Sequence, residues 1–253
     1  MTIVEPEMGL LPALCSCAKA SIDVGAHKGM YTRCLLPLSR QVFAFEPYRE
    51  LCEQLRLICG PERLTIVEKA LSDRNGYGVI NAPIRLKKGA LSPQYSRASL
   101  VAPLKQLLTA DPAYYKDLQQ RSIRLGKLDD EAIAGVGFIK IDVEGAEEEV
   151  LLGARETITR DRPSMLIEIE ERHRPGALGR IVSLLGAWDY DLYFWHGTRL
   201  NPASSFDLER MQTGPLQRAG ARPPRIVPGY VNNFVALDRS VQAKHDWLIG
   251  QQT

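Results

Sequence analysis

Short apolar runs recur along the chain, and most of them are followed by a turn rich in glycine or acid and then by a helical pattern. Alternation of apolar runs with amphipathic helices predicts βα units and a largely parallel sheet. The first run leads into the turn at 23–29. The strands expected after it cover residues 41–47, 64–73, 137–141, 163–169, 190–196 and 230–237. The fold class predicted from this pattern is α/β.

Between several of these apolar runs, apolar residues recur with the spacing of an amphipathic helix. Helices are expected at 7–18, 48–59 and 175–188 and in the segment that begins near Glu147. The first of them belongs to an N-terminal helical segment, 1–19, placed ahead of the first strand. Pro47 stands at the start of the second helix, where proline is tolerated. These helices are the connections that parallel strands require.

Residues 77–124 interrupt this rhythm before the fourth strand. Two strands, 77–86 and 119–125, are expected at its ends. Long connections of this kind often form lids or binding loops. The segment is therefore interpreted as a substrate-side insertion, with a decorative hairpin as the alternative. A second loop, 201–228, is rich in Pro, Arg and Gly and leaves room for a short helix at 206–212.

Composition fits one domain, 1–253, in a soluble globular protein: 45% of residues are apolar and 25% are charged. A net charge of +2 gives no global argument for nucleic acid or anionic membranes. No apolar run reaches the roughly 18 residues of a membrane span. The five cysteines lack C-x-x-C spacing, and the start has no basic region, so a reducing, cytoplasmic location is expected.

The turn after the first strand reads D-x-G-x-x-x-G, with Asp23, Gly25 and Gly29. Glycines at such a turn let backbone N–H groups approach a ligand. The dinucleotide fingerprint would need glycines where Val24 and Ala26 stand. A carboxylate favours a nearby cation, so Asp23 suits S-adenosylmethionine, which carries a sulfonium and an ammonium, better than NAD. The alternative is an ordinary βα turn or another nucleotide.

Glu46 follows the second strand, 21 residues after Gly25. An acid at about this spacing accepts hydrogen bonds from ribose hydroxyls in related cofactor folds. The competing interpretation is a solvated acid in a first helical turn. Ser72 and Asp73 follow the third strand and are predicted to face the adenine side of the cofactor, although both are ordinary turn residues.

Acids also follow the fourth and fifth strands. Asp142 and Glu144 come directly after a buried run, and strand alternation puts Glu168 and Glu170 on one face, with His173 in the next loop. Asp142, Glu168 or Glu170, and His173 are therefore expected to converge as a carboxylate–imidazole group that acts as general base, and Asp142, Glu168 and His173 are the catalytic candidates. A divalent metal site and a structural ion-pair group stay open as alternatives, and a metal is not expected.

Several motifs occur in one order along the chain. They are D-V-G-A-x-x-G (23–29), F-E-P (45–47), A-L-S-D (70–73), L-D-D (128–130), K-I-D-V-E-G-A-E (140–147), R-P followed by I-E-I (162–169) and N-N-F (232–234). Together they resemble the FkbM family of S-adenosylmethionine-dependent methyltransferases. The resemblance implies a class I methyltransferase (Rossmann-like) fold, with a seven-stranded, mostly parallel sheet and helices on both faces.

The same resemblance implies methyl transfer to a hydroxyl oxygen of a small molecule, natural product or sugar, with S-adenosylhomocysteine as product. Asp23, Gly25 and Gly29 would contact the methionine end of the cofactor. Glu46 would contact the ribose, and Asp73 would lie near the adenine. Asp142 would face the charged end of the cofactor or the acceptor. The remaining cofactor-site candidates are His27, Pro47 and Ser72, and His27 stands where the family usually has asparagine.

Two other functions remain open. An NAD-dependent oxidoreductase is disfavoured by the glycine spacing and by Asp23. A non-catalytic cofactor-binding module is disfavoured by the intact acids at 23, 46 and 142. The predicted partner is a small-molecule or saccharide acceptor, with no nucleic acid and no membrane span. Oligomeric state is left open.

Overall fold

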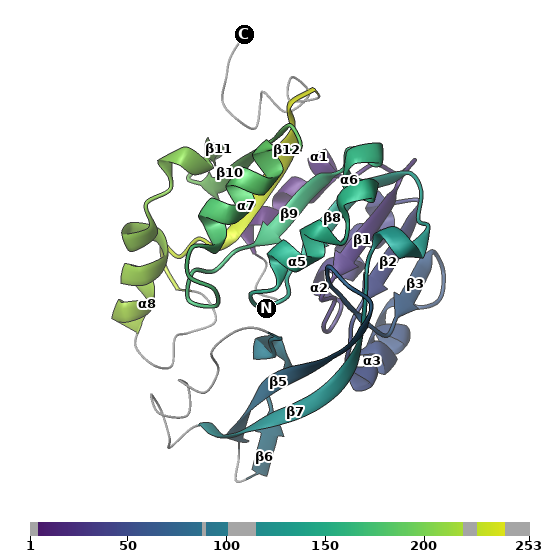
Figure 1. Cartoon of the computed structure of the whole chain (residues 1–253), viewed down its shortest axis with the longest axis vertical. Helices are drawn as coiled ribbons and strands as arrows, with labels where there is room; N and C mark the ends of the chain where they lie inside the picture. The colour runs from purple at the N-terminus through teal and green to yellow at the C-terminus, as the bar shows by residue number, and fades with distance from the viewer. Residues whose placement is uncertain (1–4, 88–89, 101–114, 220–226, 241–253) are drawn as a thin grey trace.

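A mixed, mostly parallel sheet forms the centre of the fold (Figure 1). The computed structural model describes residues 5–87, 90–100, 115–219 and 227–240. Strand order in this sheet is β11-β10-β12-β9-β8-β1-β2-β3. The strands are β1 (Ala20–Val24), β2 (Gln41–Phe45), β3 (Leu64–Val67), β8 (Val136–Ile141), β9 (Ser164–Glu168), β10 (Tyr190–His196), β11 (Arg199–Pro202) and β12 (Asn233–Asp238).

Strands β3, β2, β1, β8 and β9 pair in parallel, and β12 runs antiparallel to both of its neighbours, β9 and β10. The α/β prediction is confirmed, but the sheet has eight strands where seven were expected. The additional strand is β11. A tight turn at Gly197, whose φ is +70°, sends the chain back so that His196 pairs with Arg199.

Helices cover both faces of the sheet (Figure 1). One core packs α5 (Glu147–Leu152), α6 (Arg155–Asp161) and α7 (Ala177–Gly186) against it. The other packs the N-terminal segment and α2 (Met30–Leu35), while α3 (Arg49–Cys59) joins a smaller cluster on β2 and β3. Buried apolar side chains on each face of the central strands explain why these strands read as continuous apolar runs.

Local sequence changes two predicted helices. The expected helix at 7–18 is a 3₁₀ turn, Pro6–Leu10, followed by a single α-turn, α1 (Leu11–Leu14). Pro12 fits the first turn of α1 but would break a longer helix. The predicted short helix at 206–212 is a π-helical turn, Glu209–Thr213, that continues into α8 (Gly214–Ala219).

A second sheet, with the order β4-β7-β5-β6, lies beside the end of the main sheet (Figure 1). Its strands are β4 (Ala70–Leu71), β5 (Gly76–Lys87), β6 (Ala90–Pro93) and β7 (Tyr115–Gly126). The two strands predicted at 77–86 and 119–125 are confirmed as the antiparallel pair β5 and β7. Part of the predicted insertion, 88–89 and 101–114, lies outside the described residues.

The predicted third strand, 64–73, was wrong in extent. Strand β3 ends at Val67, whose carbonyl accepts hydrogen bonds from the amides of Glu46 and Lys69. The bond from Lys69 closes a three-residue turn that takes the chain off the main sheet. Ala70 and Leu71 then pair in parallel with β7. The same stretch therefore contributes to both sheets.

Within the part of the chain that the structure describes, no helix is long and apolar enough to span a membrane.

Candidate functional site

A cavity lies where the carboxyl ends of β1, β2 and β8 face the second sheet. It holds about 740 Å³ of space not filled by atoms, its open mouth included. The main sheet contributes Gly25, Glu46, Asp142 and Glu144 to its lining, among others. The second sheet and the segment leading from it contribute Ile80, Tyr95, Ala98 and Leu100. Binding at the carboxyl ends of strands is the usual arrangement in open α/β sheets.

The turn after β1 requires glycine at two positions for different reasons. Gly25 has a φ of +78°, and a Cβ built on it would lie 1.9 Å from the backbone oxygen of Asp142. Gly29 has a φ of +76°, and a Cβ there would lie 2.5 Å from the side chain of Leu55. Gly25 therefore permits a close approach of backbone beside the cavity, and Gly29 permits α3 to pack on the turn.

Glu46 is buried at the end of β2 and accepts two backbone hydrogen bonds. The amides of His27 and Tyr48 donate to its carboxylate at 2.8 and 2.9 Å. Burial raises the pKa of Glu46 to about 7, against the lowering effect of these two bonds. His27 and Pro47 line the cavity beside it, and His27 has a φ of +48°. Glu46 thus connects the glycine turn to the start of α3.

A smaller cavity of about 350 Å³ adjoins the glycine turn and is lined in part by Asp23, Tyr31, Lys140 and Asp142. Asp23 is buried and accepts a hydrogen bond of 2.5 Å from the hydroxyl of Thr32. Burial raises its pKa to about 6. Asp142 lines both cavities, so the structure brings the acids of β1 and β8 together as the sequence predicted.

Lys140 was not assigned a role from the sequence. Its side chain is buried, and its ammonium lies 3.2 Å from the amide oxygen of Asn233 and 4.9 Å from the centroid of the Tyr31 ring. The positive charge of Lys140 lowers the pKa of Asp23 and partly offsets the burial effect. A lysine inside an otherwise apolar strand, two residues before an acid, was the available signal.

Ser72 and Asp73 do not line either of these cavities. The Ser72 hydroxyl donates to Asp73 at 3.1 Å, and Asp73 pairs with the exposed Arg74. Ala70 and Leu71 line the larger cavity instead. The early end of β3 explains this, because the chain has already left the main sheet when it reaches these residues.

An aromatic wall stands beside Glu46. The rings of Tyr48 and Tyr95 have centroids 4.3 Å apart, and both line the cavity. The guanidinium of Arg121 lies 5.2 Å from the Tyr48 centroid and donates to Glu50 of α3 at 2.7 Å. These contacts join the second sheet to the main domain at the cavity.

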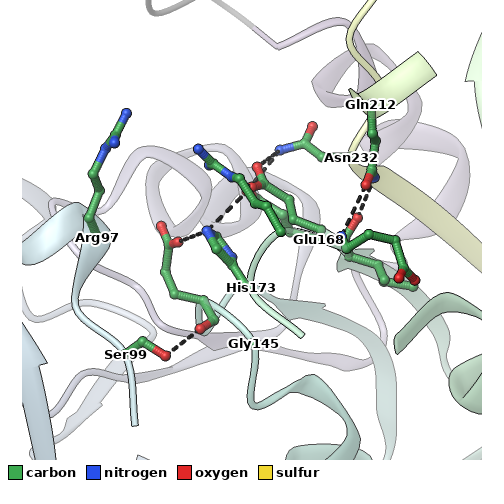
Figure 2. A network of polar contacts seen from close by, with 12 residues as sticks. Arg97, Ser99, Gly145, Glu168, His173, Gln212 and Asn232 are labelled. Atoms are coloured by element: carbon green, nitrogen blue, oxygen red, sulfur yellow. Dashed lines mark hydrogen bonds and ion pairs between the residues drawn. The ribbon is translucent and has the colours of Figure 1, made fainter. Parts of the chain in front are cut away.

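The structure brings His173 and Glu170 of the predicted acid–imidazole group together, and Glu144 is a member that was not predicted (Figure 2). His173 Nε2 lies 3.1 Å from a carboxylate oxygen of Glu144 and 3.4 Å from one of Glu170. Burial lowers the pKa of His173 to about 4, so its imidazole is neutral near pH 7. Glu170 also contacts Arg172, whose charge helps to hold the pKa of Glu170 below its usual value against burial.

Glu168 reaches this group through Asn232. The amide of Asn232 donates to Glu168 at 2.8 Å and to Glu170 at 3.1 Å (Figure 2). Burial, followed by the charge of Asp142, raises the pKa of Glu168 well above its ordinary value. Neither Glu168 nor His173 lines the larger cavity, whereas Glu144 and Asp142 do.

Gln212 fixes the loop that carries His173. Its side-chain amide donates to the carbonyls of Ile169 and Val231 at 2.7 and 3.0 Å, and its oxygen accepts from the amide of Glu171 at 3.0 Å (Figure 2). Sequence reasoning missed both Gln212 and Asn232, because their partners near His173 are about 40 to 60 residues away in the chain.

Among the residues that the structure describes, no group of three His, Cys, Asp or Glu side chains is arranged to hold a metal ion. Ion pairing with Arg172 and hydrogen bonding to Asn232 instead account for the partners of the acids near His173.

Comparisons with known proteins identify the family of the chain. The model of the methyltransferase FkbM domain matches residues 23–192, more than half of the chain. The 2-O-methyltransferase NoeI of Sinorhizobium fredii (strain NBRC 101917 / NGR234) is 30% identical over 151 residues, which cover 56% of this chain and 59% of that protein. The match thus spans less than two thirds of the relative's length.

A solved structure shows the same fold. Methyltransferase FkbM from Methylobacillus flagellatus KT superposes with a TM-score of 0.52 at 17% identity, covering 87% of this chain and 44% of that chain. The family match contains the glycine turn, Glu46, Asp142 and His173. On the extent of that match, the chain belongs to the methyltransferase FkbM domain family.

Proposed function

We propose that this protein is an S-adenosylmethionine-dependent methyltransferase that acts on a hydroxyl group of a small molecule, natural product or sugar, on a class I methyltransferase fold. The observation that carries the proposal is the meeting of Gly25, Glu46 and Asp142 around one cavity. Family membership supports methyl transfer. The relative NoeI is a 2-O-methyltransferase, which supports oxygen as the accepting atom.

The residues around the cavities fit the proposed cofactor. Asp23, Gly25 and Asp142 would hold its methionine end at the smaller cavity, where the two carboxylates would favour its cationic groups although the ammonium of Lys140 lines the same cavity. Glu46 would accept from the ribose hydroxyls, since a carboxylate has about four lone-pair sites and backbone donors occupy two here. When bound, S-adenosylmethionine supplies a methyl group activated by a sulfonium.

The adenine would lie against apolar wall residues, Tyr48, Ala70 and Leu71. Ser72 and Asp73 lie just beyond this wall, and an adenine contact by either of them stays a prediction. A dinucleotide fits less well, because two carboxylates, Asp23 and Asp142, stand where a pyrophosphate would need donors.

Glu144 lines the larger cavity and contacts His173, and it would be the acid that meets the acceptor. Burial, followed by the charge of Glu170, raises the pKa of Glu144 well above its ordinary value, which makes its ionised form a stronger base. Glu144 would take the proton of the attacking hydroxyl, and the neutral imidazole of His173 would orient it from behind. Asp142 lies between the two cavities, and Glu168 acts more remotely through Asn232.

Calorimetric titration of the purified protein with S-adenosylmethionine, S-adenosylhomocysteine and NAD tests the cofactor. Both adenosyl ligands are expected to bind, and Asp23→Ala and Glu46→Ala are expected to lose that binding. Binding of NAD alone would favour an oxidoreductase. Absence of binding by all three ligands would favour a non-catalytic module.

His173→Gln and Glu144→Gln test the acceptor side. Each is expected to lower turnover by about 100-fold or more, the usual effect of losing acid–base assistance. Affinity for S-adenosylmethionine is expected to stay within about twofold, because the proposed cofactor contacts are made by Asp23, Gly25, Glu46 and Asp142 and by neither of these side chains. Turnover is measured as S-adenosylhomocysteine formed with a panel of mono- and oligosaccharides, across pH.

The pH profile separates the two roles. Loss of Glu144 removes the dependence of turnover on its ionisation, whereas loss of His173 shifts that dependence along the pH axis. Wild-type turnover in both variants would exclude the pair from the reaction.

A further inference from the structure

Ser99 links the second sheet to the acid that faces the cavity. Its side chain is buried, and its hydroxyl donates to the backbone carbonyl of Glu144 at 2.5 Å (Figure 2). The backbone of Ser99 exchanges two hydrogen bonds of 2.9 Å with Asn81 of β5. The residue that carries this hydroxyl is therefore anchored by its backbone to the second sheet.

Glu144 needs such a partner. It has a φ of +55°, in the left-handed region, which is unfavourable for a residue other than glycine. Ser99 binds the carbonyl of Glu144, and the carboxylate of Glu147 accepts from the next amide, that of Gly145, at 2.8 Å. Both contacts hold the peptide unit that joins Glu144 to Gly145, and they thus support the backbone conformation in which the carboxyl group of Glu144 reaches His173.

The residues on either side of Ser99 contribute to the wall of the cavity. Ala98 and Leu100 line the cavity directly. The segment that shapes this wall is therefore the one that holds Glu144. Because side chains alternate along an extended backbone, Ser99 points to Glu144 while its neighbours face the cavity.

We propose that Ser99 is a positioning residue through which the second sheet sets the geometry of the Glu144–His173 pair for the reaction. The expected effect of Ser99 on turnover rests on the proposed function. The structural core of the inference, the dependence of the His173 environment on Ser99, can be measured without any acceptor or cofactor.

The test is an NMR pH titration of the His173 imidazole in the whole protein. His173 is one of four histidines, and its signal is assigned by its loss in His173→Gln. In Ser99→Ala, Glu144 is released and water reaches the imidazole, so the pKa of His173 is expected to rise by about one unit or more from its depressed value. Ser99→Thr, which keeps the hydroxyl, is expected to titrate like the wild type.

Ser21→Ala is the matched control. Ser21 is as buried as Ser99, and its hydroxyl lies 2.6 Å from that of Ser39. The substitution removes this contact, which lies toward the end of β1 that is far from the cavity. It reports the general effect of deleting a buried hydroxyl, and it is expected to leave the His173 titration unchanged. If Ser99→Ala does not fold, Ser99→Cys, which has a weaker donor of similar size, takes its place.

A wild-type His173 titration in Ser99→Ala, or an equal shift in Ser21→Ala, overturns the inference. Calorimetry separates this failure from failure of the proposed function. Wild-type protein that does not bind S-adenosylmethionine contradicts the methyltransferase proposal and leaves the titration result standing. In a working enzyme, Ser99→Ala is expected to lower turnover about tenfold or more, with cofactor affinity within about twofold and with Ser99→Thr restoring turnover.

Discussion

Gly25→Ala is expected to weaken binding of S-adenosylmethionine at least about 100-fold, which corresponds to about 2.7 kcal/mol. A Cβ at this position would lie 1.9 Å from the backbone oxygen of Asp142, so the turn or the end of β8 must move. The affected residues are those that would hold the methionine end of the cofactor. Calorimetric titration of the variant measures the loss directly.

Gly60→Ala separates this clash from backbone strain. Gly60 also has a positive φ, +69°, but a Cβ there meets no atom within 4 Å. Because its ψ is 172°, a region that is essentially restricted to glycine, the substitution is expected to cost about 1–3 kcal/mol of stability while leaving cofactor affinity unchanged. Thermal unfolding of both variants shows the shared part of the effect. Wild-type affinity in folded Gly25→Ala would contradict the cofactor placement.

Glu46→Gln is expected to change the pH dependence of both stability and binding. Burial raises the pKa of Glu46 from 4.5 to about 7 in the folded chain. An acid with a raised pKa contributes its stability below pH 4.5, and that contribution is lost as pH rises through about 7. The free energy of unfolding of the wild type should therefore fall, relative to the variant, across this interval.

The affinity for S-adenosylmethionine is expected to change with pH in the direction opposite to the stability. Ribose hydroxyls donate best to the ionised carboxylate, so wild-type affinity for S-adenosylmethionine is expected to rise as pH increases through about 7. At one pH unit below that value, affinity should be about tenfold weaker than on the plateau. The variant should bind weakly with no such slope.

In both experiments, the quantity to compare between wild type and variant is the slope of the curve against pH. The amide introduced by Glu46→Gln must turn its NH₂ toward one of two backbone donors, which costs an amount of stability that does not change with pH. Denaturant unfolding and calorimetry over the same pH series supply the two curves. Parallel stability curves for wild type and variant would show that Glu46 does not titrate near neutral pH.

Sequence pattern predicted the central sheet well because its strands are buried on both faces and bounded by turns. It failed where pairing is non-local. The split between Val67 and Ala70 depends on β7, which follows more than 40 residues later. Strand β11 was missed because four residues ending in Pro202 carry no apolar alternation.

The same division applies to the site. Gly25, Glu46 and Asp142 were predictable because each stands at a fixed place after an apolar run, where parallel strands end together. Lys140 and Ser99 were not, because their partners Asn233 and Glu144 lie far away in sequence. Ser72 and Asp73 were placed beside the adenine on the assumption of a longer third strand.

The parallel pairing of Ala70–Leu71 with β7 has a consequence for protein engineering. A segment between two strands of a core sheet is ordinarily a module that can be exchanged as one piece. Here, removal of 77–124 would leave only Leu125 and Gly126 of β7 to pair with β4, and it would take away the wall that Tyr95 supplies to the cavity. Chimaeras between relatives should therefore transfer 68–126 as one unit, or keep the backbone and exchange side chains at 95–100.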